Sequence, residues 1–240
     1  MSSTAKRSGR RCTSVGAGLR KFFFDGDVLY VCGERGMLAR STDGGKNFEP
    51  ITTGATVCMN TIVRGDGALW ACGDFGAYVS RDDGKTWTKA DVDGEITRPQ
   101  DSDLGVLLPS DKGCLYVARS GAIRKTTLDA GVSLWAASAT SQGTIIAVGA
   151  NGAIYRSADG GNAFEKIASG VTTSLENVAC TQSGLVVVVG QAGVILRSVD
   201  DGAHFDRVAQ SYTDGWLFGA APLGDQVLVA GAERLILTVG

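Results

Sequence analysis

A repeated pattern of serine, aspartate, glycine and an aromatic residue is the feature of this sequence that could do chemistry. It occurs clearly four times, as STDGGKNF from Ser41, SRDDGKTW from Ser80, SADGGNAF from Ser157 and SVDDGAHF from Ser198. A carboxylate near a hydroxyl could serve acid–base catalysis or bind calcium. The same residue types also build tight turns, because Ser and Asp side chains bond to nearby backbone and Gly adopts positive φ. Repetition favours the turn, since an active site is normally unique.

In each copy we therefore predict a structural role for four residues. They are Ser41, Asp43, Gly45 and Phe48; Ser80, Asp82, Gly84 and Trp87; Ser157, Asp159, Gly161 and Phe164; and Ser198, Asp200, Gly202 and Phe205. A fifth, degenerate copy, TLDAGVSL, starts at Thr127 and ends on a leucine in place of the aromatic.

Short apolar runs ending in turn residues organise the whole chain. They are VLYVCG from Val28, ALWACG from Ala68, CLYVAR from Cys114, TIIAVG from Thr144, LVVVVG from Leu185 and QVLVAG from Gln226, at intervals of 40, 46, 30, 41 and 41 residues. A turn and a second apolar run follow each, which predicts a β-hairpin. Further candidate strands lie on both sides. Four short strands in about forty residues is the period of a β-propeller blade.

The sequence thus predicts an all-β fold: one domain over residues 1–240, a six-bladed β-propeller of four-stranded antiparallel blades. The blades are centred near 28–48, 68–87, 114–134, 144–164, 185–205 and 226–240, after a flexible basic tail at 1–9. The last repeat ends after three strands, so residues 10–16 are predicted to complete it and close the ring, leaving no free sheet edge. The interval of 30 residues suggests that the third blade lost or shortened its outer strand.

The serine–aspartate pattern resembles the Asp box, or BNR repeat, of neuraminidases and many other propellers. The resemblance implies that the boxes lie on turns between third and fourth strands, away from the active face. The stretch GANGAIYRSADGGNAF from Gly149 also resembles short propellers of the photosystem II stability/assembly-factor-like group, which implies binding rather than catalysis. The neuraminidase Phe/Tyr-Arg-Ile-Pro motif is absent, and no catalytic residue of that family can be transferred by position.

Composition narrows the function further. His204 is the only histidine, the six cysteines form no CxxC pair, and no phosphate-loop pattern occurs, so we predict no metal, no cofactor and no catalytic residue. A net charge of −2 argues against a nucleic-acid partner. No apolar stretch is long enough for a membrane span, and no signal peptide is recognisable. We expect a soluble, monomeric, cytoplasmic protein.

A binding surface is expected on the face opposite the boxes, where the turn residues vary from blade to blade. The candidates are Arg35, Asp74, Phe75, Arg98, Arg119, Asn151, Gln191, Arg234 and Trp216. Arg98 lies in an acidic stretch, Asp91–Asp103, interpreted as a long link on that face. Trp216 alternates with Phe218 on the sixth inner strand, so both point the same way, toward the axial channel or the core. We predict a non-catalytic binding or scaffold module for a protein partner; the alternative is a glycan-binding or glycoside-hydrolase (sialidase-like) propeller.

Overall fold

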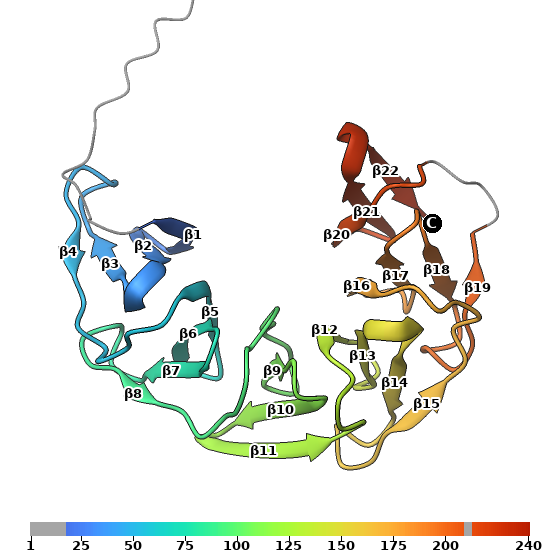
Figure 1. Cartoon of the computed structure of the whole chain (residues 1–240), viewed down its shortest axis with the longest axis horizontal. Coiled ribbons are helices and arrows are strands. Elements are labelled where there is room, and N and C mark those ends of the chain that lie inside the picture. The colour runs from blue at the N-terminus through green and yellow to red at the C-terminus, as the bar shows by residue number, and fades with distance from the viewer. Residues whose placement is uncertain (1–17, 209–212) are drawn as a thin grey trace, which may run out of the picture.

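The computed structural model describes residues 18–208 and 213–240, which form an all-β fold. Its strands make six antiparallel sheets, each built from consecutive strands of the chain. Figure 1 shows these sheets following one another around an arc, with the first and sixth at its two ends. Six sheets fit the six predicted blades, and we number the blades accordingly.

The strand bounds are as follows. Blade 1 has β1 (Leu19–Asp25), β2 (Val28–Gly33), β3 (Leu38–Ser41) and β4 (Glu49–Pro50). Blade 2 has β5 (Met59–Gly65), β6 (Ala68–Gly73), β7 (Gly76–Ser80) and β8 (Thr88–Lys89). Blade 3 has β9 (Val106–Pro109), β10 (Cys114–Arg119) and β11 (Ala122–Thr127).

Blade 4 has β12 (Leu134–Ala139), β13 (Ile145–Gly149), β14 (Ile154–Ser157) and β15 (Glu165–Ile167). Blade 5 has β16 (Leu175–Cys180), β17 (Val186–Gly190), β18 (Ile195–Ser198) and β19 (Asp206–Arg207). Blade 6 has β20 (Leu217–Leu223), β21 (Gln226–Gly231) and β22 (Ile236–Val239). Three short 3-10 turns complete the elements: η1 (Glu34–Gly36), η2 (Ala150–Gly152) and η3 (Ala232–Arg234).

The core lies between neighbouring blades. Strand β17 shows why its sequence is apolar throughout: Val186 and Val188 pack toward blade 4, while Val187 and Val189 pack toward blade 6. Side chains alternate across a strand, so a strand buried on both faces needs no polar positions. The described hydrophobic clusters join blades 1–2, 2–3, 3–4, 4–5 and 5–6, and none of them joins blade 6 to blade 1.

Blade 3 is in a different register from the predicted one. Its β9 pairs with β10, and residues 96–101 pair with β9 through the bridges Ile96↔Ser110 and Gln100↔Leu107. The Asp111 amide donates to the Glu95 carbonyl, as the amide after the second strand does in the other blades, for example Glu34 to Gly18. Residues 96–101 are therefore the inner strand, and β9, β10 and β11 are the second, third and fourth.

Two predictions about this blade are wrong. CLYVAR is the third strand rather than the second, and the outer strand has not been lost. The inner strand was missed because Pro99 has no N–H for a ladder and made the segment look like a loop. With β9 as the second strand, second strands begin at residues 28, 68, 106, 145, 186 and 226, an even repeat.

The degenerate fifth copy of the pattern is not a turn of the same kind. Thr127 ends β11 and Leu134 starts β12, so this segment links blades 3 and 4. The turn between the third and fourth strands of blade 3 is instead Ser120–Gly121, with φ of 51° and 84°. Positive φ at both central positions is the mark of a tight two-residue hairpin turn.

The predicted closing segment, residues 10–16, and the tail at 1–9 lie outside the described residues. Among the described residues, blade 6 has three strands and β22 has no fourth-strand partner. The helical elements described here are single turns, and none is long or apolar enough to cross a membrane.

The cysteines give a first testable prediction. Within the described residues all five are free thiols; Cys32 and Cys72 are buried, and burial raises the pKa of Cys32 to about 12 and that of Cys72 further. Because the thiolate is the reactive form, these two thiols should alkylate at least about 100-fold more slowly in native than in unfolded protein. Mass spectrometry after a timed iodoacetamide pulse measures this, with the half-buried Cys58 as the internal reference. Equal labelling of all three thiols would contradict the packing of blades 1 and 2.

Candidate binding site between the inner strands

The sheets have two distinct ends. We call "box end" the end that carries the serine–aspartate turns and the turns between first and second strands. We call "link end" the end that carries the turns between second and third strands and the connections between blades. Box turns lie between β3 and β4, β7 and β8, β14 and β15, and β18 and β19, as the resemblance implied.

The box carboxylates are occupied by their own turns. In blade 2, Ser80 Oγ donates to Asp82 Oδ1 at 2.8 Å, and the Gly84 amide donates to Ser80 Oγ at 2.8 Å. The Thr86 amide also donates to Asp82 Oδ1 at 2.8 Å. This bond and the Thr86 and Ser80 hydroxyls lower the pKa of Asp82 to about 2, because each stabilises the ionised form.

The other three copies repeat this network. The pKa of the aspartate is lowered in each, first by backbone amides of the turn: Asp43, Asp159 and Asp200. His204 Nδ1 lies 2.7 Å from Asp200 Oδ2 on an exposed turn. In residues 18–208 and 213–240, no group of three or more His, Cys, Asp or Glu side chains could hold a metal ion. Four equivalent, internally bonded carboxylates support a structural role.

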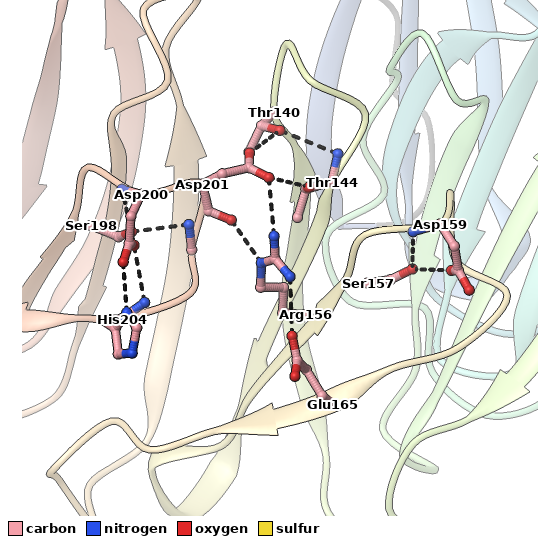
Figure 2. Close-up of polar contacts among 11 residues, drawn as sticks. Thr140, Thr144, Arg156, Ser157, Asp159, Glu165, Ser198, Asp200, Asp201 and His204 are labelled. Atoms are coloured by element: carbon pink, nitrogen blue, oxygen red, sulfur yellow. Dashed lines mark hydrogen bonds and ion pairs between the residues drawn. The ribbon is translucent and has the colours of Figure 1, made fainter.

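Each of three boxes also contacts the preceding blade. Tyr30 Oη of blade 1 donates to the Asp83 carbonyl, and Arg124 of blade 3 donates to the Gly160 carbonyl. Figure 2 shows the third contact, in which Arg156, Thr140 and Thr144 of blade 4 all donate to Asp201 of blade 5. The box aromatics Trp87, Phe164 and Phe205 pack into the corresponding interfaces between blades. The boxes thus join neighbouring blades at one end.

A cavity between the inner strands lies toward the link end. A cavity of about 600 Å³ is lined by inner strands of all six blades. Its charged and aromatic lining consists of Lys21, Glu95, Arg98, Trp135 and Glu176. A cavity of this size with several polar groups is typical of a binding site.

A β-bulge near the start of the inner strands sets which side chains line this cavity. The register shifts between Leu19 and Lys21, Met59 and Thr61, Leu134 and Ala136, Leu175 and Asn177, and Leu217 and Gly219. The extra residue of each bulge is Arg20, Asn60, Trp135, Glu176 or Phe218. A bulge places an additional side chain at that point of the strand and redirects it. Three of these residues, Asn60, Trp135 and Glu176, line the cavity, so the repeated bulge supplies it with side chains of different chemistry.

In blades 1, 2 and 5 the bulge residue forms an ion pair or a hydrogen bond with the first residue of the turn between the second and third strands. Arg20 pairs with Glu34 at 3.6 Å, and Asn60 Nδ2 donates to Asp74 at 2.8 Å. Gln191 Nε2 donates to Glu176 at 3.0 Å. Where the bulge residue is aromatic, Trp135 or Phe218, the turn carries alanine. The polar side of the cavity is thus held in place by the adjacent turns.

The cavity charges are not neutralised by one another. Among the described residues, Lys21, Arg98, Glu95 and Glu176 form no ion pair. Burial raises the pKa of Glu95, and the nearby carboxylates of Asp74 and Asp111 raise it further. Trp135 Nε1 is buried without a hydrogen-bond partner in the described part of the chain. These groups retain their capacity to bind charged or hydrogen-bonding ligands.

Of the predicted binding residues, Asp74, Arg98 and Gln191 lie at or beside this cavity. Phe75, on the turn between β6 and β7, is 67% exposed. Trp216 precedes β20 at the same end and is 59% exposed, so it is not a core residue; Phe218 is exposed as well. The binding role of these side chains stays a prediction.

The remaining turn-tip candidates differ in position. Arg35 and Asn151 sit at link-end turn tips with φ of 56° and 57°, and Arg234 ends η3. Arg119 was predicted to lie at the link end with the other candidates, and that placement is wrong. The turn after it lies at the box end, where Ser120 and Gly121 amides donate to Asp66. The error follows from the register of blade 3.

The acidic stretch Asp91–Asp103 is also not one link. Residues 90–95 connect blades 2 and 3, and residues 96–101 are the inner strand that brings Arg98 to the cavity. Asp101 and Asp103 lie at the other end, beside a cavity of about 390 Å³ that the Thr140–Gly143 turn also lines. Sequence reasoning missed Asn60, Trp135 and Glu176. Their common signal is their place as second residue of an inner strand.

Comparisons with known proteins agree with this architecture. The BNR/Asp-box repeat family matches residues 78–89. YCF48 bound to a D1 peptide superposes with a TM-score of 0.67 at 19% identity, covering 90% of this chain and 76% of that one. The WD40 β-propeller domain of Doa1 gives 0.70 at 12% identity, with 94% and 79% coverage. An ancestral GH74 enzyme gives 0.68 at 11% identity, with 92% and 36% coverage.

No curated protein sequence matches this chain significantly. At these identities, the solved structures share the fold with it and nothing more specific. The repeat match falls on β7, its box turn and β8, the same segment whose hydrogen bonds define the box geometry. The chain carries a BNR/Asp-box repeat on an all-β arrangement of six antiparallel sheets that is similar to solved β-propellers.

Proposed function

We propose that this propeller is a non-catalytic binding module that recognises a protein partner at the link end, in and around the axial cavity. The observation that carries the proposal is the unpaired set of charges there, Lys21 and Arg98 beside Glu95 and Glu176. Oppositely charged side chains that only kept the protein soluble would be more stable as ion pairs with one another. Charges that stay apart around a cavity are therefore suited to bind the polar groups of a peptide. YCF48, which shares the fold, has been solved with a peptide bound, and this supports a peptide as the ligand class.

A peptide selection tests this proposal. A displayed library of short random peptides is selected on the wild-type protein, and individual binders are measured by fluorescence anisotropy. Arg98→Ala should weaken them by about tenfold, the loss of one charge-assisted contact worth about 1.4 kcal/mol. Phe75→Ala should weaken the binding of those peptides that also contact the turn between β6 and β7.

Arg81→Ala is the matched control, because Arg81 is another exposed arginine but lies on the box of blade 2. Its binding constants should equal those of the wild type. Peptides that bind Arg98→Ala and wild type equally well, or that lose affinity only in Arg81→Ala, would overturn the assignment of the link end.

We also propose that the chain is a single closed propeller, with residues 10–16 as the fourth strand of blade 6. Apolar side chains exposed at both ends of the arc support closure: Phe22 and Phe24 on blade 1, Leu228 and Ile236 on blade 6.

Deleting residues 1–17 should therefore lower the melting temperature. Packing of the two exposed faces contributes about 3 kcal/mol if each phenylalanine buries its free surface. At about 2–4 °C per kcal/mol for a chain of this size, the expected decrease is about 6–12 °C. Deleting only residues 1–9 is the control and should leave the melting temperature unchanged. An unchanged value for the longer deletion would refute the strand assignment.

A monomer in a reducing, cytoplasmic compartment completes the proposal. The five free thiols among the described residues support it, since none of them is cross-linked. Light scattering after size exclusion should give a mass near 24.8 kDa.

A second candidate, a glycan-binding or glycoside-hydrolysing propeller, is supported by one observation. Glu95 and Glu176 line the same cavity, and the pKa of Glu95 is raised, as in the acid of a carboxylate pair. Hydrolysis of aryl glycosides, including an aryl sialoside, that disappears in Glu95→Gln would favour this candidate. The rate should fall as pH rises through the pKa of Glu95, because the acid must be protonated.

A further inference from the structure

The outermost strand of blade 3 differs from its counterparts. Strand β11 has six residues, whereas β4, β8, β15 and β19 have two or three. The cause is the two-residue turn Ser120–Gly121, which replaces the box and keeps β10 and β11 paired along their whole length. Figure 1 shows β11 as a long strand on the outer side of the arc. Blade 3 thus presents a long sheet edge on the rim.

The register identifies which backbone groups point away from the sheet. Arg119 and Ala122 flank the tight turn and form a hydrogen-bonded pair, and such pairs alternate along an antiparallel ladder. Ala122, Arg124 and Thr126 therefore bond toward β10, while Ile123 and Lys125 direct their N–H and C=O groups outward. In the described part of the chain, β11 pairs with no strand other than β10. An unpaired edge of this length is a template for another strand.

Charge along this edge selects the occupant. Arg119, Arg124 and Lys125 lie on it or at its end, and Arg119 and Arg124 line an adjoining cavity of about 320 Å³. Arg124 donates to the Gly160 carbonyl and to Asn162 Oδ1, both of which are uncharged, so its positive charge is not neutralised by these contacts. The carboxylate in that cavity, Asp159, is bonded by its own turn. Lys125 pairs with Asp93 at 3.1 Å, but both side chains are largely exposed, so the pair is weak. A second copy of the same edge would bring like charges together, whereas an acidic strand would complement them.

We propose that β11 binds an extended, acidic segment of a partner protein, which adds to blade 3 as a fifth strand. Backbone bonds to Ile123 and Lys125 supply the pairing. Arg119 and Arg124 lie on one face of the sheet and Lys125 on the other, and they favour acidic side chains on the added strand. This site lies on the rim of one blade, apart from the axial cavity and independent of it.

The test uses the whole protein and a capped hexapeptide of alternating glutamate and valine. Amide exchange of Ile123 and Lys125, followed by NMR, should slow by at least about tenfold at saturation, while the inward amide of Arg124 changes little. The same peptide methylated at every backbone nitrogen keeps its charge but has no donors, and it should bind at least about tenfold more weakly. A lysine–valine peptide should also bind at least about tenfold more weakly.

Protein variants separate the backbone from the charge. Lys125→Gln removes the charge alone, and Lys125→Pro also removes the outward N–H, which an edge position tolerates. Lys125→Pro should bind the glutamate–valine peptide at least about tenfold more weakly than Lys125→Gln. Arg98→Ala should bind it like the wild type, which distinguishes this site from the axial cavity. If Lys125→Pro does not fold, the affinity of the methylated peptide for the wild-type protein tests the backbone pairing instead. Equal affinity of the methylated and parent peptides, or no slowing at Ile123 and Lys125, would overturn the proposal.

Discussion

Replacing Gly152 with alanine is expected to lower the free energy of unfolding by about 2–4 kcal/mol. Gly152 ends η2 with φ of 67°, where a non-glycine residue costs about 1 kcal/mol. A Cβ there would also lie 2.0 Å from the carbonyl oxygen of Val171, on the link that follows blade 4. Because that neighbour is backbone, relief requires moving the link, and overpacking of this kind costs about 1–3 kcal/mol more.

Gly160→Ala is the matched control for this prediction. Gly160 has φ of 70° in the same blade, but nothing lies within 4 Å of the position a Cβ would take. Only the backbone cost of about 1 kcal/mol should be measured. Urea denaturation of both variants gives the difference directly. Similar losses in the two variants would mean that the link moves freely away from η2 and that the link end is less rigid than the structure indicates.

Asp201→Ala should be nearly as damaging, at about 3 kcal/mol. Its carboxylate accepts hydrogen bonds from Thr140 and Thr144 and forms an ion pair with Arg156 at 3.3 Å (Figure 2). The side chains of Arg156 and Asp201 are only 16% and 15% exposed. Removing one partner of a largely buried pair costs about 3–5 kcal/mol, because the remaining charge is left uncompensated, and the lower value suits this partial exposure.

Asp83→Ala provides the comparison at the equivalent position of blade 2. Its side chain is 81% exposed and contacts Arg64 at 3.1 Å, and Arg64 keeps Asp25 as a second partner. The expected change is within about 0.5 kcal/mol, as for other surface pairs. Chemical denaturation of both variants measures the two changes in the free energy of unfolding. A double-mutant cycle between Asp201→Ala and Thr140→Val then gives the interaction energy between these two side chains. A loss below about 1 kcal/mol for Asp201→Ala would contradict a buried role.

Much of the fold could be predicted from the sequence because the repeat is strong where blades are regular. The four boxes and the buried runs near them fixed the period, and the turns between third and fourth strands followed. The exception, blade 3, lacks a box and carries Pro99 in its inner strand. Both changes remove the local signals on which the register depended, so CLYVAR was assigned to the wrong strand and Arg119 to the wrong end.

The candidate site was harder to predict for a different reason. Asn60, Trp135 and Glu176 look like ordinary strand residues, and their common position depends on a bulge in each inner strand. A bulge has no fixed sequence signature, since it arises where two paired strands differ by one residue. The unpaired charges of the cavity likewise depend on which strands meet, and this follows from tertiary packing rather than from any one segment.

The contact between each of three boxes and the blade before it has a consequence for how the protein is made. The ribosome completes blade 1 before blade 2 and blade 4 before blade 5, so Tyr30, Thr140 and Arg156 exist before Asp83 and Asp201 are synthesised. Each such turn can dock as it emerges, on a surface already present. Growth along the arc is therefore directional, and a nascent chain need not wait for its C-terminus to begin stabilising its blades.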